Sequence, residues 1–136
     1  MGAYDLTTPE GIKIEVKSAA YVQTWYQRVL SKISFSIKSA RHWDPESNIL
    51  LAEPKRHADV YVFCLLKHED KQSIDPLNMD HWDFYVLGTF ELNNYKRSQH
   101  SITLNSLRNL THVVAYNDLE SSIKEKFILH NESISI

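Results

Sequence analysis

The feature that most constrains the fold is an eight-residue run, residues 59–66, that reads DVYVFCLL. Side chains alternate between the two faces of a strand, so apolar residues at successive positions require cover on both faces. The run is far too short to span a bilayer, and no other apolar run in the chain approaches that length. We therefore expect a central strand in a sheet that is covered on both faces.

Patterns on either side of this run predict further strands and helices. Alternation in KISFSIK, residues 32–38, predicts a strand with one buried face. The apolar stripe of Leu119, Ile123 and Phe127 predicts a helix over residues 118–128. The other expected elements are strands at 4–7, 12–18, 84–87, 100–104 and 113–116, a helix at 21–30 and a helical turn at 107–110. Together they predict an α/β or α+β fold, a mixed β-sheet flanked by helices.

The length and composition fit one globular domain. We expect this domain to cover residues 1–130 and a poorly ordered tail to cover 131–136. The single cysteine, Cys64, lies in the apolar run and favours core packing and a cytoplasmic location, with no membrane partner. The formal net charge of −2 disfavours nucleic-acid binding by bulk charge, but a nuclease that holds metal with acidic residues is an exception.

The most informative polar residues lie in the predicted N-terminal hairpin. Pro9 and Gly11 supply turn chemistry between its two strands. With residues 9–11 as the loop, Asp5 lies opposite Glu15, and Lys17 projects from the same face one step further along. Directly opposed Cβ atoms are about 4.5–5.5 Å apart, which is close enough for two carboxylates to share one cation.

Two interpretations of this trio remain open. Carboxylate oxygens suit Mg²⁺, and an ammonium beside a metal-activated water suits hydrolysis of a phosphodiester. An acidic residue two positions before a lysine is also common on the wet face of a sheet, where ion pairs contribute little. The spacing by itself does not choose between a metal site and a solvated face.

The same residues resemble a known active site. YDL, then TTPEG, then IEVKSA is similar to the active-site hairpin of the PD-(D/E)XK nucleases, the restriction-endonuclease-like superfamily. The resemblance implies that Asp5 and Glu15 are metal ligands and catalytic residues, and that Lys17 is the catalytic lysine. KISFSIK, ADVYVFCLL, WDFYVL and SQHSITL further resemble uncharacterised solo bacterial members of the superfamily.

The resemblance also implies a fold, a cofactor and a partner. It implies a restriction-endonuclease-like mixed sheet, Mg²⁺ or Mn²⁺ as cofactor, and DNA as the substrate of an endodeoxyribonuclease that forms a homodimer by analogy. The family core begins with a helix before the Asp strand, so we expect this N-terminal helix to be missing or truncated here. The sequence also has Tyr4 where the family name indicates a proline.

Basic and polar residues after the hairpin are candidate nucleic-acid contacts. They are Gln23, Arg28, Lys32, Lys38, Arg41, Arg56, Arg97 and His100. Each of them is also readily explained as a plain surface residue. The alternative function is a catalytically inactive nuclease-fold module that binds nucleic acid or a protein partner, and the simplest alternative is a sheet domain without a site.

Overall fold

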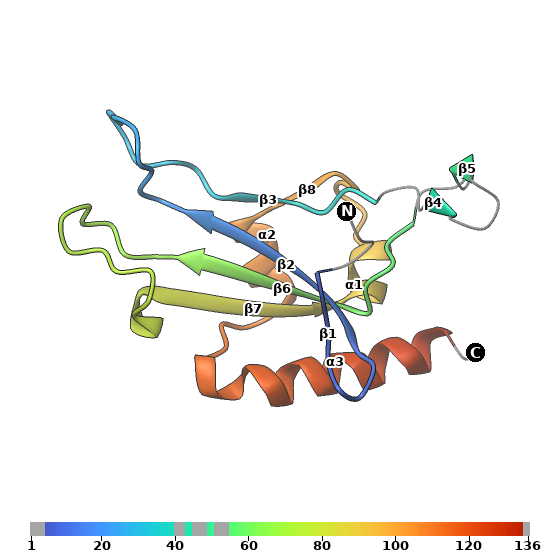
Figure 1. The fold of residues 1–136 in the computed structure, drawn as a ribbon. Coiled ribbons are helices and arrows are strands. Elements are labelled where there is room, and N and C mark those ends of the chain that lie inside the picture. The colour runs from blue at the N-terminus through green and yellow to red at the C-terminus, as the bar shows by residue number, and fades with distance from the viewer. Residues whose placement is uncertain (1–4, 40–42, 45–48, 51–54, 135–136) are drawn as a thin grey trace.

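The computed structural model describes residues 5–39, 43–44, 49–50 and 55–134. Its centre is a four-stranded mixed sheet in the order β1-β2-β6-β7 (Figure 1). The strands are β1 (Leu6–Thr7), β2 (Lys13–Ala20), β6 (Val60–Leu66) and β7 (Trp82–Gly88). β2 pairs antiparallel with β1 and parallel with β6, and β6 pairs antiparallel with β7. The prediction of a mixed sheet with the apolar run as a central strand is confirmed.

The other elements are short, except for the last helix. Two further strand pairs, both antiparallel, are β3 (Ser34–Ser36) with β8 (Ser101–Thr103), and β4 (Trp43–Asp44) with β5 (Ile49–Leu50). The α-helices are α1 (Thr89–Asn93), α2 (Leu104–Leu110) and α3 (Leu119–Ile134). Two 3₁₀ turns are η1 (Met79–His81) and η2 (Tyr116–Asp118).

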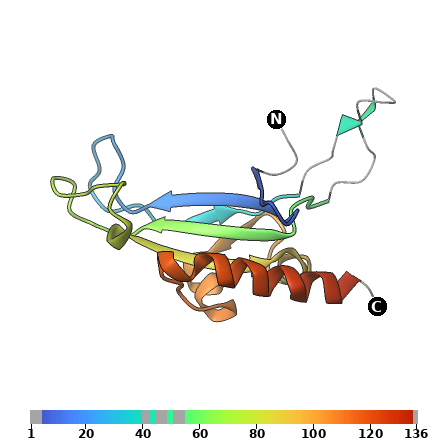
Figure 2. The ribbon, with the colours of Figure 1, turned by 60° about the horizontal axis from the view of Figure 1, so that its bottom comes forward.

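The sheet separates two hydrophobic cores, and α3 covers one of its faces (Figure 2). Ile14, Val62 and Val86 on this face pack against the helix. The helix contributes the predicted stripe of Leu119, Ile123 and Phe127. The helix continues past the predicted end at residue 128 to Ile134, so residues 131–134 extend it instead of forming a loose tail.

The opposite face carries the larger core and is covered by α1, α2 and the β3–β8 pair. Phe63 of β6 is fully buried there, and its ring meets Phe35 of β3 edge-on with centroids 5.2 Å apart. Ile33, Phe35 and Ile37 are buried as the alternation in KISFSIK predicts, although regular strand geometry covers only residues 34–36. Both faces of β6 are thus dry, which is why its sequence is apolar throughout.

The predicted helix over residues 21–30 is wrong. This segment is an irregular loop in which side-chain amides replace the helical hydrogen bonds. The Gln23 N–H donates to Gln27 Oε1 over 2.9 Å, and Gln27 Nε2 donates to the Tyr21 carbonyl oxygen over 3.2 Å. The Ser31 N–H closes the loop by donating to the same carbonyl over 3.0 Å.

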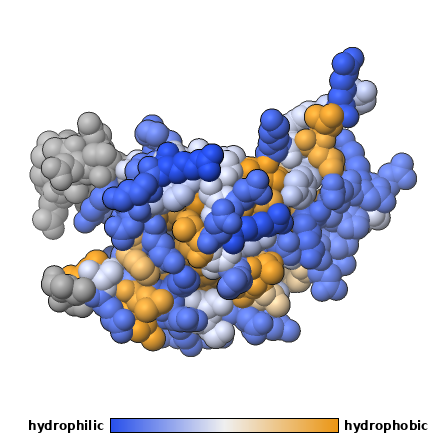
Figure 3. Space-filling model, turned by 180° about the vertical axis from the view of Figure 1, so that it is seen from behind, coloured by the Kyte–Doolittle hydropathy of each residue, from blue (hydrophilic) through white to orange (hydrophobic). Residues whose placement is uncertain are grey.

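Seen from behind, the molecule projects at the upper right, where this loop lies, and apolar atoms gather there (Figure 3).

Among the described residues, none of the helices has the length and apolar character that a membrane crossing requires.

Candidate active site

The N-terminal hairpin has the register that its turn residues predict. Leu6 pairs with Ile14, and Thr7 pairs with Lys13. The Thr8 N–H donates to the Ile12 carbonyl oxygen over 2.9 Å, and the Gly11 N–H donates back to the Thr8 carbonyl oxygen over 2.9 Å. Gly11 has a φ of 88°, a left-handed conformation that glycine adopts without strain. The loop is therefore residues 9–11, as expected.

This register brings Asp5 and Glu15 together across the hairpin. The Asp5 N–H donates to the Ile14 carbonyl oxygen over 3.0 Å, which continues the ladder one residue beyond β1. The Asp5 carboxylate accepts a hydrogen bond from the Val16 N–H over 2.8 Å and shares a second hydrogen bond with the Glu15 side chain. We call Asp5 and Glu15 the carboxyl pair.

The two carboxyl groups have different acidities. Burial, followed by the hydrogen bond and the negative charge of Asp5, raises the pKa of Glu15 to about 7, and the charge of Lys17 opposes this rise. The hydrogen bonds from Glu15 and from the Val16 N–H lower the pKa of Asp5, and Lys17 lowers it further. Within the pair, a proton is therefore held more tightly by Glu15 than by Asp5.

Glu15 is half-buried because its face of the sheet is not the wet one. Glu15 pairs with Tyr61 and Lys17 pairs with Phe63, both on the fully covered strand β6. Ala19, two positions after Lys17 on the same face of β2, packs against the larger core. The hairpin thus places Glu15 and Lys17 at the margin of the larger core. Residues on an ordinary solvated face of a sheet would have no such core beside them.

Tyr61 is a site residue that sequence reasoning missed. Its side chain is 3% exposed, and burial raises the pKa of its hydroxyl. The negative charges of Glu15 and Asp5 raise that pKa further, while a hydrogen bond and the positive charge of Arg56 lower it. Tyr61 therefore connects the carboxyl pair to Arg56. The alternation of side chains along a strand could have identified it. Once β6 is placed beside β2, Tyr61 projects from the same face of the sheet as Glu15.

Arg56, a predicted nucleic-acid contact, is half-buried and held in place. Its Nε donates to the Ile37 carbonyl oxygen over 2.9 Å. One terminal nitrogen donates to Asn93 Oδ1 and to Gln99 Oε1, each over 2.8 Å, and the other donates to the Gln99 carbonyl oxygen over 3.1 Å. The guanidinium, which precedes β6, thus links the end of β3 to α1 and to the segment before β8.

The other candidate contacts fall into two groups. Lys38, Arg97 and His100 are exposed and lie at the same end of the β3–β8 pair as Arg56, where the Ile37 N–H donates to the His100 carbonyl oxygen over 3.0 Å. Gln23, Arg28 and Lys32 belong to the loop at the opposite end of β2 from the hairpin turn (Figure 1). The Gln23 side-chain amide donates to the Ala20 carbonyl oxygen over 2.9 Å. Arg41 lies outside the described residues.

The residues that could hold a metal ion are the carboxyl pair. No cluster of three or more His, Cys, Asp or Glu side chains suited to a metal occurs in the part of the chain that the structure describes. Two carboxylates can still bind Mg²⁺, because this ion keeps several of its waters and commonly takes one or two protein carboxylates.

Comparison with known proteins identifies a family. A family model described as bacteriophage T4 endonuclease IV matches residues 2–106. The matched region contains the carboxyl pair, Lys17, Tyr61 and Arg56, together with the whole central sheet, and ends within α2. No curated protein and no solved structure matches the chain.

Proposed function

The chain belongs to the bacteriophage T4 endonuclease IV family, and on this basis we propose that it is a metal-dependent endonuclease that hydrolyses phosphodiester bonds of DNA. The proposed site consists of Asp5, Glu15 and Lys17, and we assign it to the PD-(D/E)XK type. A homodimer, which would allow both strands of a duplex to be cut, is part of the same proposal.

The observation that carries the proposal is the position of the Asp5 and Glu15 carboxyl groups, which the hairpin register brings within hydrogen-bond reach of each other. Burial is the largest cause of the rise in the pKa of Glu15 to about 7, and Asp5 adds to it, because two carboxyl groups held this closely cannot both ionise without repulsion. A divalent cation relieves that repulsion by taking the place of the proton. The donor set therefore fits Mg²⁺ or Mn²⁺, with Asp5 and Glu15 as ligands. When bound, such an ion lowers the pKa of a coordinated water and polarises a phosphoryl oxygen.

The remaining residues supply positioning and charge. Lys17 lies on the same face as Glu15, and its positive charge acts on both carboxyl groups. An ammonium in this position orients the attacking water and stabilises negative charge that develops on the phosphoryl oxygens. The backbone N–H of Val16 fixes the orientation of the Asp5 carboxylate. Arg56, which the neutral Tyr61 hydroxyl connects to the pair, adds positive charge that favours the approach of an anionic backbone.

The test is cleavage of supercoiled and linear DNA with Mg²⁺ or Mn²⁺, with EDTA as the metal-free control. We expect wild-type cleavage and a loss of at least about 100-fold in Lys17→Ala and in Glu15→Ala. Lys124→Ala is the matched control, because it removes an exposed lysine from α3 and should cut normally. Relaxation of the supercoiled substrate would identify an endonuclease.

The alternative outcomes are distinct. A folded wild-type protein that binds DNA but does not cut it with either metal would refute catalysis and favour the inactive binding module. Cleavage that survives in EDTA would refute the role of the metal. Cleavage that survives in Lys17→Ala and Glu15→Ala would place the active site elsewhere in the chain.

A further inference from the structure

Arg56 also lines a polar cavity of about 440 Å³. Lys55, Arg56 and His130 line it, together with the neutral side chains of Asn93 and Gln99. Among the described residues, no carboxylate lines this cavity. The rest of the lining is Ser39, Thr89 and the apolar Ile134. A cavity lined by two cations, amides and hydroxyl groups, without acidic residues, has the chemistry of an anion site.

Arg56 carries a positive charge that its protein partners do not neutralise. All four of its hydrogen bonds to backbone or amide groups go to neutral oxygens of Ile37, Asn93 and Gln99. Its further partner, the Tyr61 hydroxyl, is also neutral at physiological pH, because burial raises its pKa. Within the described part of the chain, Arg56 makes no ion pair. A half-buried guanidinium without a counter-ion is costly, and an anion in the cavity removes that cost.

The neighbouring side chains present donors in the same place. Asn93 accepts a hydrogen bond from Arg56 through its oxygen, which leaves its NH₂ group available to donate. The Lys55 ammonium is exposed and makes no ion pair with any described residue. Lys55 and Arg56 thus place two positive charges beside the cavity.

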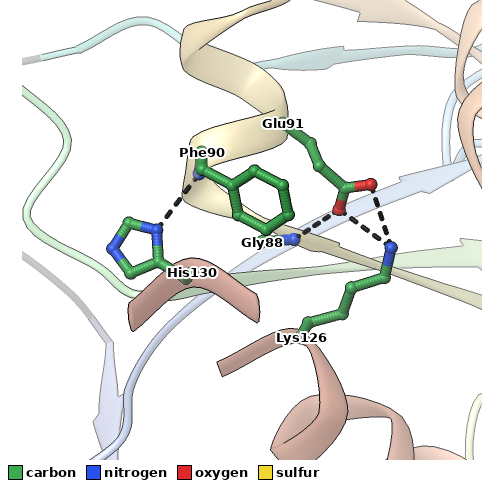
Figure 4. Close-up of polar contacts among 5 residues, drawn as sticks. All are labelled: Gly88, Phe90, Glu91, Lys126 and His130. Carbon is green, nitrogen blue, oxygen red and sulfur yellow. Dashed lines mark hydrogen bonds and ion pairs between the residues drawn. The ribbon is translucent and has the colours of Figure 1, made fainter. Parts of the chain in front are cut away.

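His130 adds a donor from α3. Its ring is buried, and Nδ1 accepts a hydrogen bond from the Phe90 N–H over 3.2 Å, so the neutral ring carries its proton on Nε2. Figure 4 shows this second nitrogen pointing away from α1. Asp59 Oδ1 lies 3.9 Å from Nε2, which is beyond hydrogen-bond distance and forms an ion pair only if the ring is protonated.

The cavity is connected to the candidate active site through two side chains, Arg56 and Tyr61. Arg56 lines the cavity and hydrogen-bonds to Tyr61, and Tyr61 pairs with Glu15 across β2 and β6. We propose that the cavity is a phosphate subsite that holds a backbone phosphate of the DNA substrate, neighbouring the phosphate at the carboxyl pair. This inference rests on the proposed nuclease function and deepens it, because it identifies how the strand is held beside the site.

The first test measures the salt dependence of DNA binding in the Lys17→Ala background, which prevents cleavage. Adding Lys55→Ala should weaken binding and reduce the magnitude of the slope of log K against log [salt] by about 0.7–0.9, the value of one lost phosphate contact. Adding Lys124→Ala in place of Lys55→Ala removes the same charge from α3 and should leave the slope unchanged. Equal slopes for the Lys55 and Lys124 variants would overturn the proposal.

The second test uses inorganic phosphate as the probe and NMR of the ¹⁵N-labelled Lys17→Ala protein as the readout. Phosphate should shift the side-chain amide signals of Asn93 and Gln99, and a short DNA oligonucleotide should displace it. Saturable phosphate binding that DNA does not displace would indicate a site for free anions and would overturn the DNA subsite. An absence of shifts with either ligand would also overturn it.

These binding readouts are independent of catalysis. If the wild-type protein fails to cut DNA while both binding tests succeed, the nuclease function fails and the phosphate site remains. If cleavage succeeds and the slopes are equal, only the subsite fails.

Discussion

Replacement of Glu15 by glutamine should remove a pH dependence of stability that the structure predicts. In the folded protein, the pKa of Glu15 is raised from an ordinary value of 4.5 to about 7, so the folded state binds this proton more tightly than the unfolded chain does. The associated stability is fully present below pH 4.5 and is lost as the pH rises through about 7. Glutamine has no proton to lose in this range.

The size of the effect follows from the same gap in pKa. Without screening, the rise from 4.5 to about 7 corresponds to about 3 kcal/mol. Glu15 is only half-buried, so solvent screening should reduce this to about 1–2 kcal/mol. For a chain of 136 residues, each kcal/mol changes the Tm by about 4 °C. The wild-type Tm should therefore fall by about 4–8 °C relative to Glu15→Gln between pH 5 and pH 8.5.

The assay is thermal unfolding of both proteins in EDTA across this pH range. Titration of the other groups largely cancels in the difference between the two curves. The lowered pKa of Asp5 does not interfere, because its stabilisation is lost only in acid, below its ordinary value of 3.8. Glu125→Gln on the exposed side of α3 is the matched control and should follow the wild type. Parallel wild-type and Glu15→Gln curves would refute the reasoning.

Three further predictions concern the site and its support. Asp5→Asn should lower the pKa of Glu15 only part of the way toward 4.5, since burial remains; a ¹³C carboxyl NMR titration measures this, and an unchanged value would contradict the pairing. Phe63→Ala should reduce the free energy of unfolding by about 3–5 kcal/mol in denaturant titrations, because the ring is fully buried against Phe35; a loss below about 1 kcal/mol would mean that the core is not packed as described. Lys126→Met should cost about 1–3 kcal/mol, because it leaves the half-buried Glu91 carboxylate without the ammonium 2.9 Å away (Figure 4); adding Glu91→Gln should recover part of that loss, and strict additivity would argue against the ion pair.

The parts of the structure that depend on neighbouring residues could be predicted from the sequence. The hairpin register depends on a three-residue loop whose proline and glycine are visible in the sequence, and that register sets Asp5 against Glu15. The central strand was equally visible, since an apolar run without alternation fits only a strand with two covered faces. The stripe on α3 identified the face of the helix that packs on the sheet.

The parts of the structure that depend on residues distant in sequence could not be predicted in this way. The spacing of Val22, Tyr26 and Val29 resembles a helix, but Gln23 and Gln27 satisfy the backbone of this segment with their side chains, which a periodic pattern does not reveal. The apolar stripe predicts an end of the helix at residue 128, whereas α3 continues to Ile134. Its last turns are stabilised by contacts such as that of His130 with α1, which the stripe does not reveal.

The chemistry of the site also required the fold. The acidity of Glu15 depends on its burial, and this burial comes from the pairing with a strand that begins some 45 residues later. The immobilisation of Arg56 by Asn93 and Gln99 joins three separate parts of the chain. The sequence predicts Arg56 as a nucleic-acid contact from its charge and its place after the hairpin, but it does not predict these partners, because none of them is adjacent to Arg56 in sequence.

The way the hairpin and the parallel pairing are connected has a consequence for the order of folding. A hairpin closes within microseconds, so Asp5 and Glu15 can meet before the rest of the sheet exists. The parallel pairing of β2 with β6 must close a long intervening segment and is therefore slower. Until β6 docks, Glu15 lacks the burial that is the largest cause of its raised pKa. During refolding at pH 6, the uptake of a proton by Glu15 should therefore coincide with the docking of β6. The protonation of Glu15 thus reports when the central strand joins the sheet.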